Sequence, residues 1–224
     1  MYSTRFRSFA VIFGVSALMA AASTSDDQRL IGRLDDRTRA AVVEVVEGAR
    51  RDGLPTEPLI DKALEGASKQ APGPRIVAVV RALVGDLKRA REALGPASSH
   101  KDVEAGAAAL RAGISVSELE RLKAAKSSLH VASALDVMTI LTNDGVPPDS
   151  IAPRVVNLVL AGATGEQLAS MREEIKRYIN GGVAATIAAT LGGQGLEQRL
   201  IAQSAANTSN SGGPGSPLPS VRGQ

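Results

Sequence analysis

The sequence has no cysteine and no tryptophan, only two histidines, and aromatic residues make up 2% of its 224 positions. Without cysteine the chain forms no disulfide, so its stability must come from helix propensity and aliphatic packing. Cysteine-based zinc sites are excluded by the same absence. Aromatic faces are the usual platforms for single-stranded nucleic acids and for sugars, so their scarcity argues against recognition of either.

The first 22 residues have the pattern of a secretory signal peptide. Arg5 and Arg7 give a positive start, Phe9 to Ala22 is uncharged and apolar, and small residues then favour cleavage before Ser23. The apolar run is shorter than the roughly 20 residues that span a membrane. We therefore predict export to the periplasm or the extracellular medium, with an uncleaved N-terminal anchor as the alternative. The mature chain has no predicted integral membrane span.

Cleavage changes the charge balance of the chain. Loss of Arg5 and Arg7 reduces the 26 basic residues to 24, which face 23 acidic ones, so the net charge falls from +3 to +1. Tyr178 is then the only aromatic residue. Because no domain-wide positive excess remains, we expect no nucleic-acid partner.

Residues 23–203 are predicted to form an all-α domain, because their apolar residues recur at helical spacing and none of their segments alternates with period two. One face of a first helix ending at Gly53 consists of Val42, Val43, Val45, Val46 and Ala49. A longer stripe consists of Ile76, Val79, Val80, Leu83, Leu87 and Leu94. Residues 204–224 are rich in Ser, Gly, Asn and Pro, and we predict a disordered tail there.

Three glycines, Gly53, Gly113 and Gly145, each follow one helical pattern and precede another. The segments around them share a register. Ten residues before the glycine, the three copies have Val43, Val103 and Leu135. Seven residues before it they have Val46, Gly106 and Met138, and six residues after it they have Leu59, Leu119 and Ile151. Only the first and third copies also agree 18 and 23 residues after the glycine, with Ala71 and Ala163, and Ile76 and Leu168, where the second has Val131 and Asp136.

A glycine just past a helix end takes the left-handed conformation that closes the helix, and the next aliphatic residue packs back on it. A unit that buries its apolar face only against its neighbours is typical of stacked helical hairpins. We therefore predict a short α-solenoid-like array. An irregular helical bundle is the alternative, since the copies are 60 and then 32 residues apart.

Further helix limits follow from capping and glycine patterns. Ser115 with Glu118, and Thr164 with Gln167, have capping-box spacing. Pro153 fits the first turn of a helix that begins near Ser150. The sequence also predicts a short apolar helix from Val183 to Leu191, bracketed by the glycine pairs 181–182 and 192–193, which caps the array, and a final short helix over residues 196–203.

No residue pattern indicates a catalytic, cofactor or metal site. His100 and His130 are thirty residues apart and lack the partner ligands that a transition metal needs. The acidic doublets precede helical patterns, where they complement the helix dipole; they are Asp26 with Asp27 and Asp35 with Asp36.

Other residue groups that could suggest a catalytic or nucleotide-binding site have a structural explanation. Four glutamates stand beside basic residues at spacings typical of exposed helical ion pairs, such as Glu173 with Arg177; they are Glu118, Glu120, Glu173 and Glu174. Ser98 and Lys101 have Ser-x-x-Lys spacing but lie in a polar loop, and Gly192 to Gly195 lacks the Lys of a phosphate loop. The PxxP spacing within residues 214–219 is interpreted as tail.

These observations favour an exported, non-enzymatic helical-repeat protein that acts as a protein–protein interaction module of the cell envelope. The partner is an unidentified protein. The alternative is a carrier of an apolar small molecule or lipid between helices. An enzyme that uses dispersed glutamates or serines is the third and weakest hypothesis.

Overall fold

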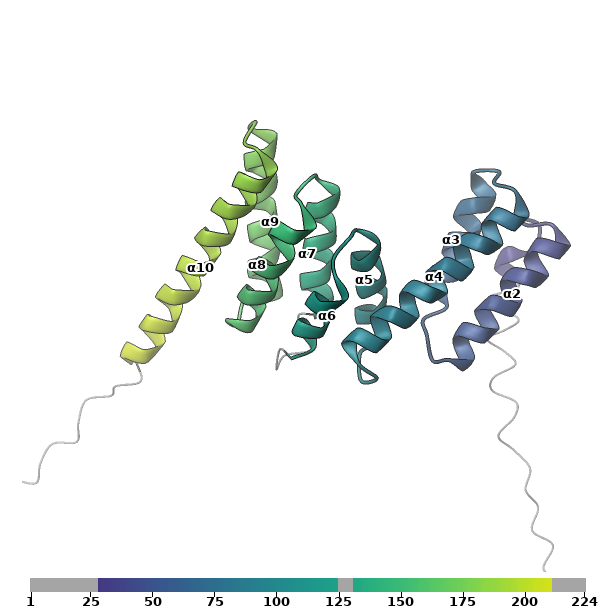
Figure 1. Cartoon of the computed structure of the whole chain (residues 1–224), viewed down its shortest axis with the longest axis horizontal. Coiled ribbons are helices and arrows are strands. Elements are labelled where there is room, and N and C mark those ends of the chain that lie inside the picture. The colour runs from purple at the N-terminus through teal and green to yellow at the C-terminus, as the bar shows by residue number, and fades with distance from the viewer. Residues whose placement is uncertain (1–27, 125–130, 211–224) are drawn as a thin grey trace, which may run out of the picture. The chain divides into compact units, whose positions relative to one another are not determined.

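A computed structural model describes residues 28–124 and 131–210 of the chain (Figure 1). Every regular element in these two ranges is an α-helix, which confirms the all-α prediction. The predicted signal peptide, residues 1–22, and residues 211–224 of the predicted tail lie outside the described residues.

The chain divides into two compact units, Met1–Val84 and Gly85–Gln224, with the boundary inside one helix. The first unit contains α2 (Asp36–Arg51), α3 (Glu57–Ser68) and the first turns of α4 (Gly73–Leu94). The second contains the rest of α4 and then α5 (His100–Arg111), α6 (Val116–Lys123), α7 (Val131–Asn143), α8 (Pro148–Leu160), α9 (Gly165–Asn180) and α10 (Ala185–Asn210).

Helices in the second unit pack mainly on the helix two further along the chain. α5 contacts α7, and α7 contacts α9; likewise α6 contacts α8, and α8 contacts α10. Contacts of α7 with α8 and of α9 with α10 join these two sets. α5, α7 and α9 therefore form one layer, and α6, α8 and α10 form the other.

The three predicted glycine junctions are confirmed. Gly53, Gly113 and Gly145 have φ values of 68°, 95° and 92°, in the left-handed region. At the third junction the Val146 amide donates to the Leu141 carbonyl at 2.9 Å and the Gly145 amide donates to Thr142 at 3.0 Å. This pair of bonds is the Schellman motif, which satisfies the last carbonyls of the helix and reverses the chain.

Three further junctions have the same pair of bonds, and the sequence did not reveal them as such. Gln70, Gly162 and Gly182 also have positive φ, and the residue after each donates to a carbonyl five residues earlier. The agreement of Ala71 with Ala163 in the sequence therefore marks a second junction in each copy. At all six junctions the sixth following residue is buried: Leu59, Ile76, Leu119, Ile151, Leu168 and Ala188.

Replacing Gly145 by valine should lower the free energy of unfolding by about 1–2 kcal/mol, the cost of left-handed backbone for an L-residue. A Cβ at Gly145 meets no atom within 4 Å, so the effect isolates backbone strain from steric overlap. Chemical denaturation of both proteins measures the difference. Gly85, in α4, likewise has open space where a Cβ would lie but no positive φ, so Gly85→Ala should instead stabilise the chain. Equal midpoints for Gly145→Val and wild type would contradict this account of the junction.

Most predicted core positions are buried. Val42, Val46 and Ala49 of α2 are buried, and so is the α4 stripe except for Val79, which is 38% exposed. Val43 and Val45 are half-buried, at the edges of the α2 face.

The two predicted capping boxes differ in completeness. Thr164 and Gln167 each accept from the other's backbone amide, at 3.2 and 2.8 Å, so this box is complete. Ser115 accepts from the Glu118 amide at 3.3 Å, but the Glu118 carboxylate pairs with Arg121 at 2.8 Å and does not return the bond.

The predicted break at glycines 192–193 is wrong, because α10 runs through them without interruption. These glycines serve close packing instead. A Cβ on Gly192 would lie 2.5 Å from the Ile175 side chain, and one on Gly193 would lie 2.1 Å from Cδ of Arg154.

The last helix, α10, also passes Gln203, the predicted end of the domain, and continues to Asn210, since Ala205 and Ala206 are good helix formers. Pro153 lies inside α8, which begins at Pro148, earlier than predicted.

Candidate functional site

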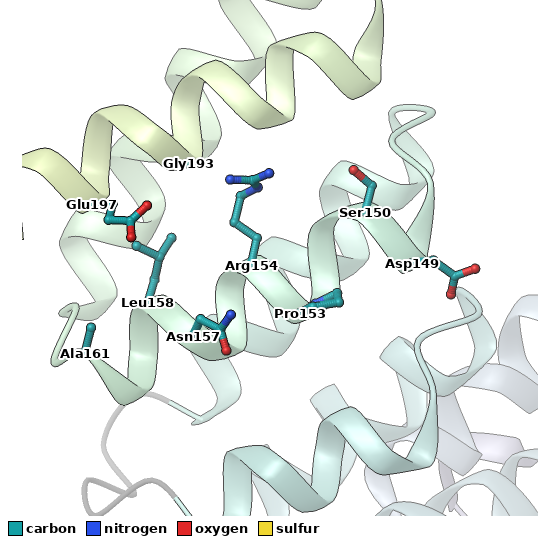
Figure 2. A pocket seen from close by; sticks show the side chains of 9 residues that line it. All are labelled: Asp149, Ser150, Pro153, Arg154, Asn157, Leu158, Ala161, Gly193 and Glu197. Atoms are coloured by element: carbon teal, nitrogen blue, oxygen red, sulfur yellow. The ribbon is translucent and has the colours of Figure 1, made fainter.

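A cleft of about 300 Å³ lies between α8 and α10 of the second unit (Figure 2). Because residues four and seven apart share one face of a helix, Ser150, Arg154 and Asn157 all line it from α8. Gly193 and Glu197 line it from α10. The remaining lining residues are Asp149, Pro153, Leu158 and Ala161.

Arg154 is the central charged group of this cleft. Figure 2 shows its guanidinium rising from α8 toward α10 beside Gly193. Within the described residues it makes no ion pair, and its Nε is buried without a hydrogen-bond partner. A buried donor without an acceptor is costly, and more so when it carries charge. The Nε is thus enclosed beside Gly193, while the guanidinium has no ion pair among the described residues.

Gly193 explains how an arginine fits at this place. Any side chain there would overlap the Arg154 stem, whose Cδ would lie 2.1 Å from the added Cβ. The glycine lets α10 approach α8 closely while the arginine stem passes between them. The opposing helix thus holds the stem and leaves the guanidinium toward the opening.

Two further polar groups flank the guanidinium. The Asn157 Oδ1 accepts from Arg121 of α6 at 2.6 Å, which leaves the amide nitrogen as a donor. In Figure 2 that nitrogen points to the side of Arg154. The Ser150 hydroxyl stands one turn before Arg154 on the same face. The site thus combines one cation with a hydroxyl and an amide that donate hydrogen bonds.

Two carboxylates limit the charge of the cleft. Glu197 lies to one side of Arg154, and Asp149 lies at the far edge and is directed away from it (Figure 2). Neither is within ion-pairing distance of Arg154. With Arg154 counted, the formal charge of the cleft lining is therefore −1.

Only one of the two histidines can be placed in the structure. His100 is exposed at the start of α5, and His130 lies outside the described residues. Within residues 28–124 and 131–210 the structure contains no group of three or more His, Cys, Asp or Glu placed to hold a metal ion.

The glutamates considered in the sequence lie in separate contacts. Glu118 pairs with Arg121, and Glu174 contacts Arg199 at 3.5 Å and the Tyr178 hydroxyl at 3.1 Å. The predicted pair of Glu173 with Arg177 is wrong, because Glu173 accepts from the neighbouring Arg172 at 2.6 Å. The four side chains do not form a shared site.

The Ser-x-x-Lys segment is a helix start. Ser99, rather than Ser98, is the N-cap of α5 and forms a complete capping box with Asp102. The other Asp102 oxygen accepts from the Ala132 amide of α7 at 3.1 Å. Asp102 is therefore a structural link between two helices. Asp36 lies in the first turn of α2, as expected for an acid that complements the helix dipole, whereas Asp35 is the N-cap and accepts from the Thr38 amide at 2.9 Å. Asp26 and Asp27 lie outside the described residues.

Two acids away from the cleft, Glu65 and Asp86, are held by basic partners. Hydrogen bonds from Lys62 and Lys69 lower the pKa of Glu65 to about 2. Burial would raise the pKa of Asp86, but hydrogen bonds from Arg111 and Arg89 outweigh it and lower the pKa. The Glu65 pairs lie within α3 and its C-cap, whereas Asp86 with Arg111 joins α4 to α5.

Among the described helices, none combines the length and the apolar character that crossing a bilayer requires. Comparison with known proteins found no family model, no curated protein and no solved structure that matches this chain.

Proposed function

We propose that this chain is an exported, non-enzymatic helical-repeat protein that binds another protein in the cell envelope. The observation that carries the proposal is that α5, α6, α7 and α8 each pack on the helix two further along. Repeated stacking of this kind is how helical arrays build extended surfaces for partners. It favours the solenoid-like arrangement over the irregular bundle.

Exposed apolar side chains on the last helix support the same function. Ile187, Leu191 and Ile201 of α10 are 56%, 44% and 57% exposed. Their spacing places them on one face of the helix, away from Ala188 and Leu196, which are buried. Exposed apolar residues gathered in this way are typical of protein interaction surfaces.

The clefts of the structure favour a protein partner over an apolar small molecule. The cleft beside Arg154 measures about 300 Å³, and others of about 430 and 270 Å³ are also lined by charged residues, such as Arg81 and Lys62. Charged linings suit a lipid poorly, because a bound acyl chain would desolvate them. No observation favours the carrier hypothesis to a comparable degree.

Native mass spectrometry of the chain, purified gently from its own host, tests this function. We expect an N-terminus at Ser23 and a retained partner of protein size. A matched preparation in which Ile187 and Leu191 are both replaced by Ser should lose that partner while keeping its helical circular dichroism. A retained mass of lipid size would instead support the carrier, and a chain beginning at Met1 would contradict cleavage.

A further inference from the structure

We propose that the cleft between α8 and α10 is a carboxylate-binding site, with Arg154 as its anion-binding group and Ser150 and Asn157 as supporting donors. The ligand is an acidic side chain on a peptide segment of the partner. This inference rests on the proposed function only for the source of the carboxylate. The chemistry of the cleft stands by itself.

The first step is that Arg154 lacks an internal partner although one is near. Glu197 lines the same cleft, yet no ion pair joins the two residues. The Arg154 Nε is buried and unpaired, while Gly193 leaves the space through which the arginine stem passes. An external acceptor that enters the opening can pair with the outer nitrogens of the guanidinium, with the Ser150 hydroxyl and the Asn157 amide in the same lining. A cation held in this way suits an anion that enters from the opening.

The second step selects a carboxylate over a phosphate. A planar guanidinium pairs with either anion through two parallel hydrogen bonds. Glu197 and Asp149 in the same lining repel a doubly charged anion more than a singly charged one. The volume of about 300 Å³ admits an acidic side chain and its flanking atoms.

The third step concerns the source of the carboxylate. Ile201 lies one turn after Glu197 on α10 and is 57% exposed. Ile201 lies beyond the cleft lining, so a peptide that runs from Arg154 along α10 can bring an apolar residue to it. A free small carboxylate gains nothing from that contact. The pairing of cation and apolar side chain favours a peptide.

The test follows the Nε–H signal of Arg154 by proton–nitrogen NMR on the ¹⁵N-labelled exported chain. The ligands are an acetylated, amidated tripeptide of alanine, glutamate and leucine, its glutamine counterpart, sodium acetate and sodium phosphate. We expect the glutamate tripeptide to shift the signal in a saturable way and to bind more tightly than the other three. Backbone amide shifts report on binding in variants that lack the arginine.

Arg154→Met should weaken binding of the glutamate tripeptide by about tenfold to a hundredfold, the range for a lost charged hydrogen-bond pair. Arg154→Lys should weaken it less, because it keeps the charge but not the paired geometry. Arg177→Met removes an exposed arginine of α9 and should leave the affinity unchanged. Thermal unfolding of each variant checks that it is folded. If Arg154→Met does not fold, the loss of affinity in Arg154→Lys tests the site instead.

Equal binding of the glutamate and glutamine peptides, or unchanged affinity in Arg154→Met, would overturn the site. Tighter binding of phosphate would overturn its assignment to a carboxylate, and acetate binding as tight as the peptide would overturn the peptide source. These results are separate from the mass-spectrometry test. If the cleft binds the glutamate tripeptide but no protein partner is retained, only the proposed function is contradicted. If a protein partner is retained but the cleft does not bind the tripeptide, only this inference is contradicted.

Discussion

Asp102→Ala should lower the free energy of unfolding by roughly 2–4 kcal/mol, the sum of the lost capping-box bond from the Ser99 amide and a buried Ala132 amide left without an acceptor. Asp102 is 8% exposed and serves two helices. One carboxylate oxygen accepts from the Ser99 amide at 3.1 Å and hydroxyl at 2.7 Å, and the other accepts from the Ala132 amide. Chemical denaturation monitored by circular dichroism measures the loss.

Two comparisons separate the parts of this effect. Glu166, an exposed acid in the first turn of α9, contributes through the helix dipole alone, so Glu166→Ala should cost only about 0.3–1 kcal/mol. Asp102→Asn retains one acceptor oxygen and should fall between the two. If Asp102→Ala cost no more than Glu166→Ala, the link from α5 to α7 through Ala132 would be wrong.

Leu168→Ala is expected to destabilise the chain by about 2–5 kcal/mol, the range for deleting a fully buried leucine side chain. Leu168 is inaccessible and is the sixth residue after the left-handed Gly162. Its loss leaves a cavity beneath the helix junction that the surrounding helices fill only in part. Denaturant unfolding of wild type and variant gives the difference.

Leu160, eight residues earlier and 49% exposed, provides the matched substitution. Leu160→Ala removes the same atoms from a largely hydrated position and should change stability by no more than about 0.5 kcal/mol. Similar losses from Leu160→Ala and Leu168→Ala would contradict the role given to the sixth position after each junction.

The sequence alone was sufficient to predict the all-α fold and three of the six helix junctions with the Schellman motif. Gly53, Gly113 and Gly145 were recognisable because glycine signals the left-handed conformation directly. Gln70 adopts it with a φ of 54°, and no local pattern distinguishes that glutamine from others. The match of Ala71 with Ala163 indicated that something recurred there, but only the backbone shows that it is a second helix end.

The candidate site was beyond what the sequence could predict. Nothing in the chain near Arg154 indicates that this arginine lacks a carboxylate partner, because that depends on how α10 lies against α8. The glycines of α10 were interpreted as a helix break, yet Gly193 is what admits the arginine stem. For Asp102, the spacing from Ser99 shows a cap, whereas Ala132 comes from a helix thirty residues away.

The glycines that let α10 approach its neighbours also lower its own preference for the helical state. Gly192, Gly193 and Gly195 stand in the middle of the helix, and each disfavours helix by about 0.8–1 kcal/mol relative to alanine. A peptide of residues 185–210 would consequently be mostly random coil in water. The final helix owes its conformation to the surface on which it lies, so its folding and its docking on α8 and α9 are one event.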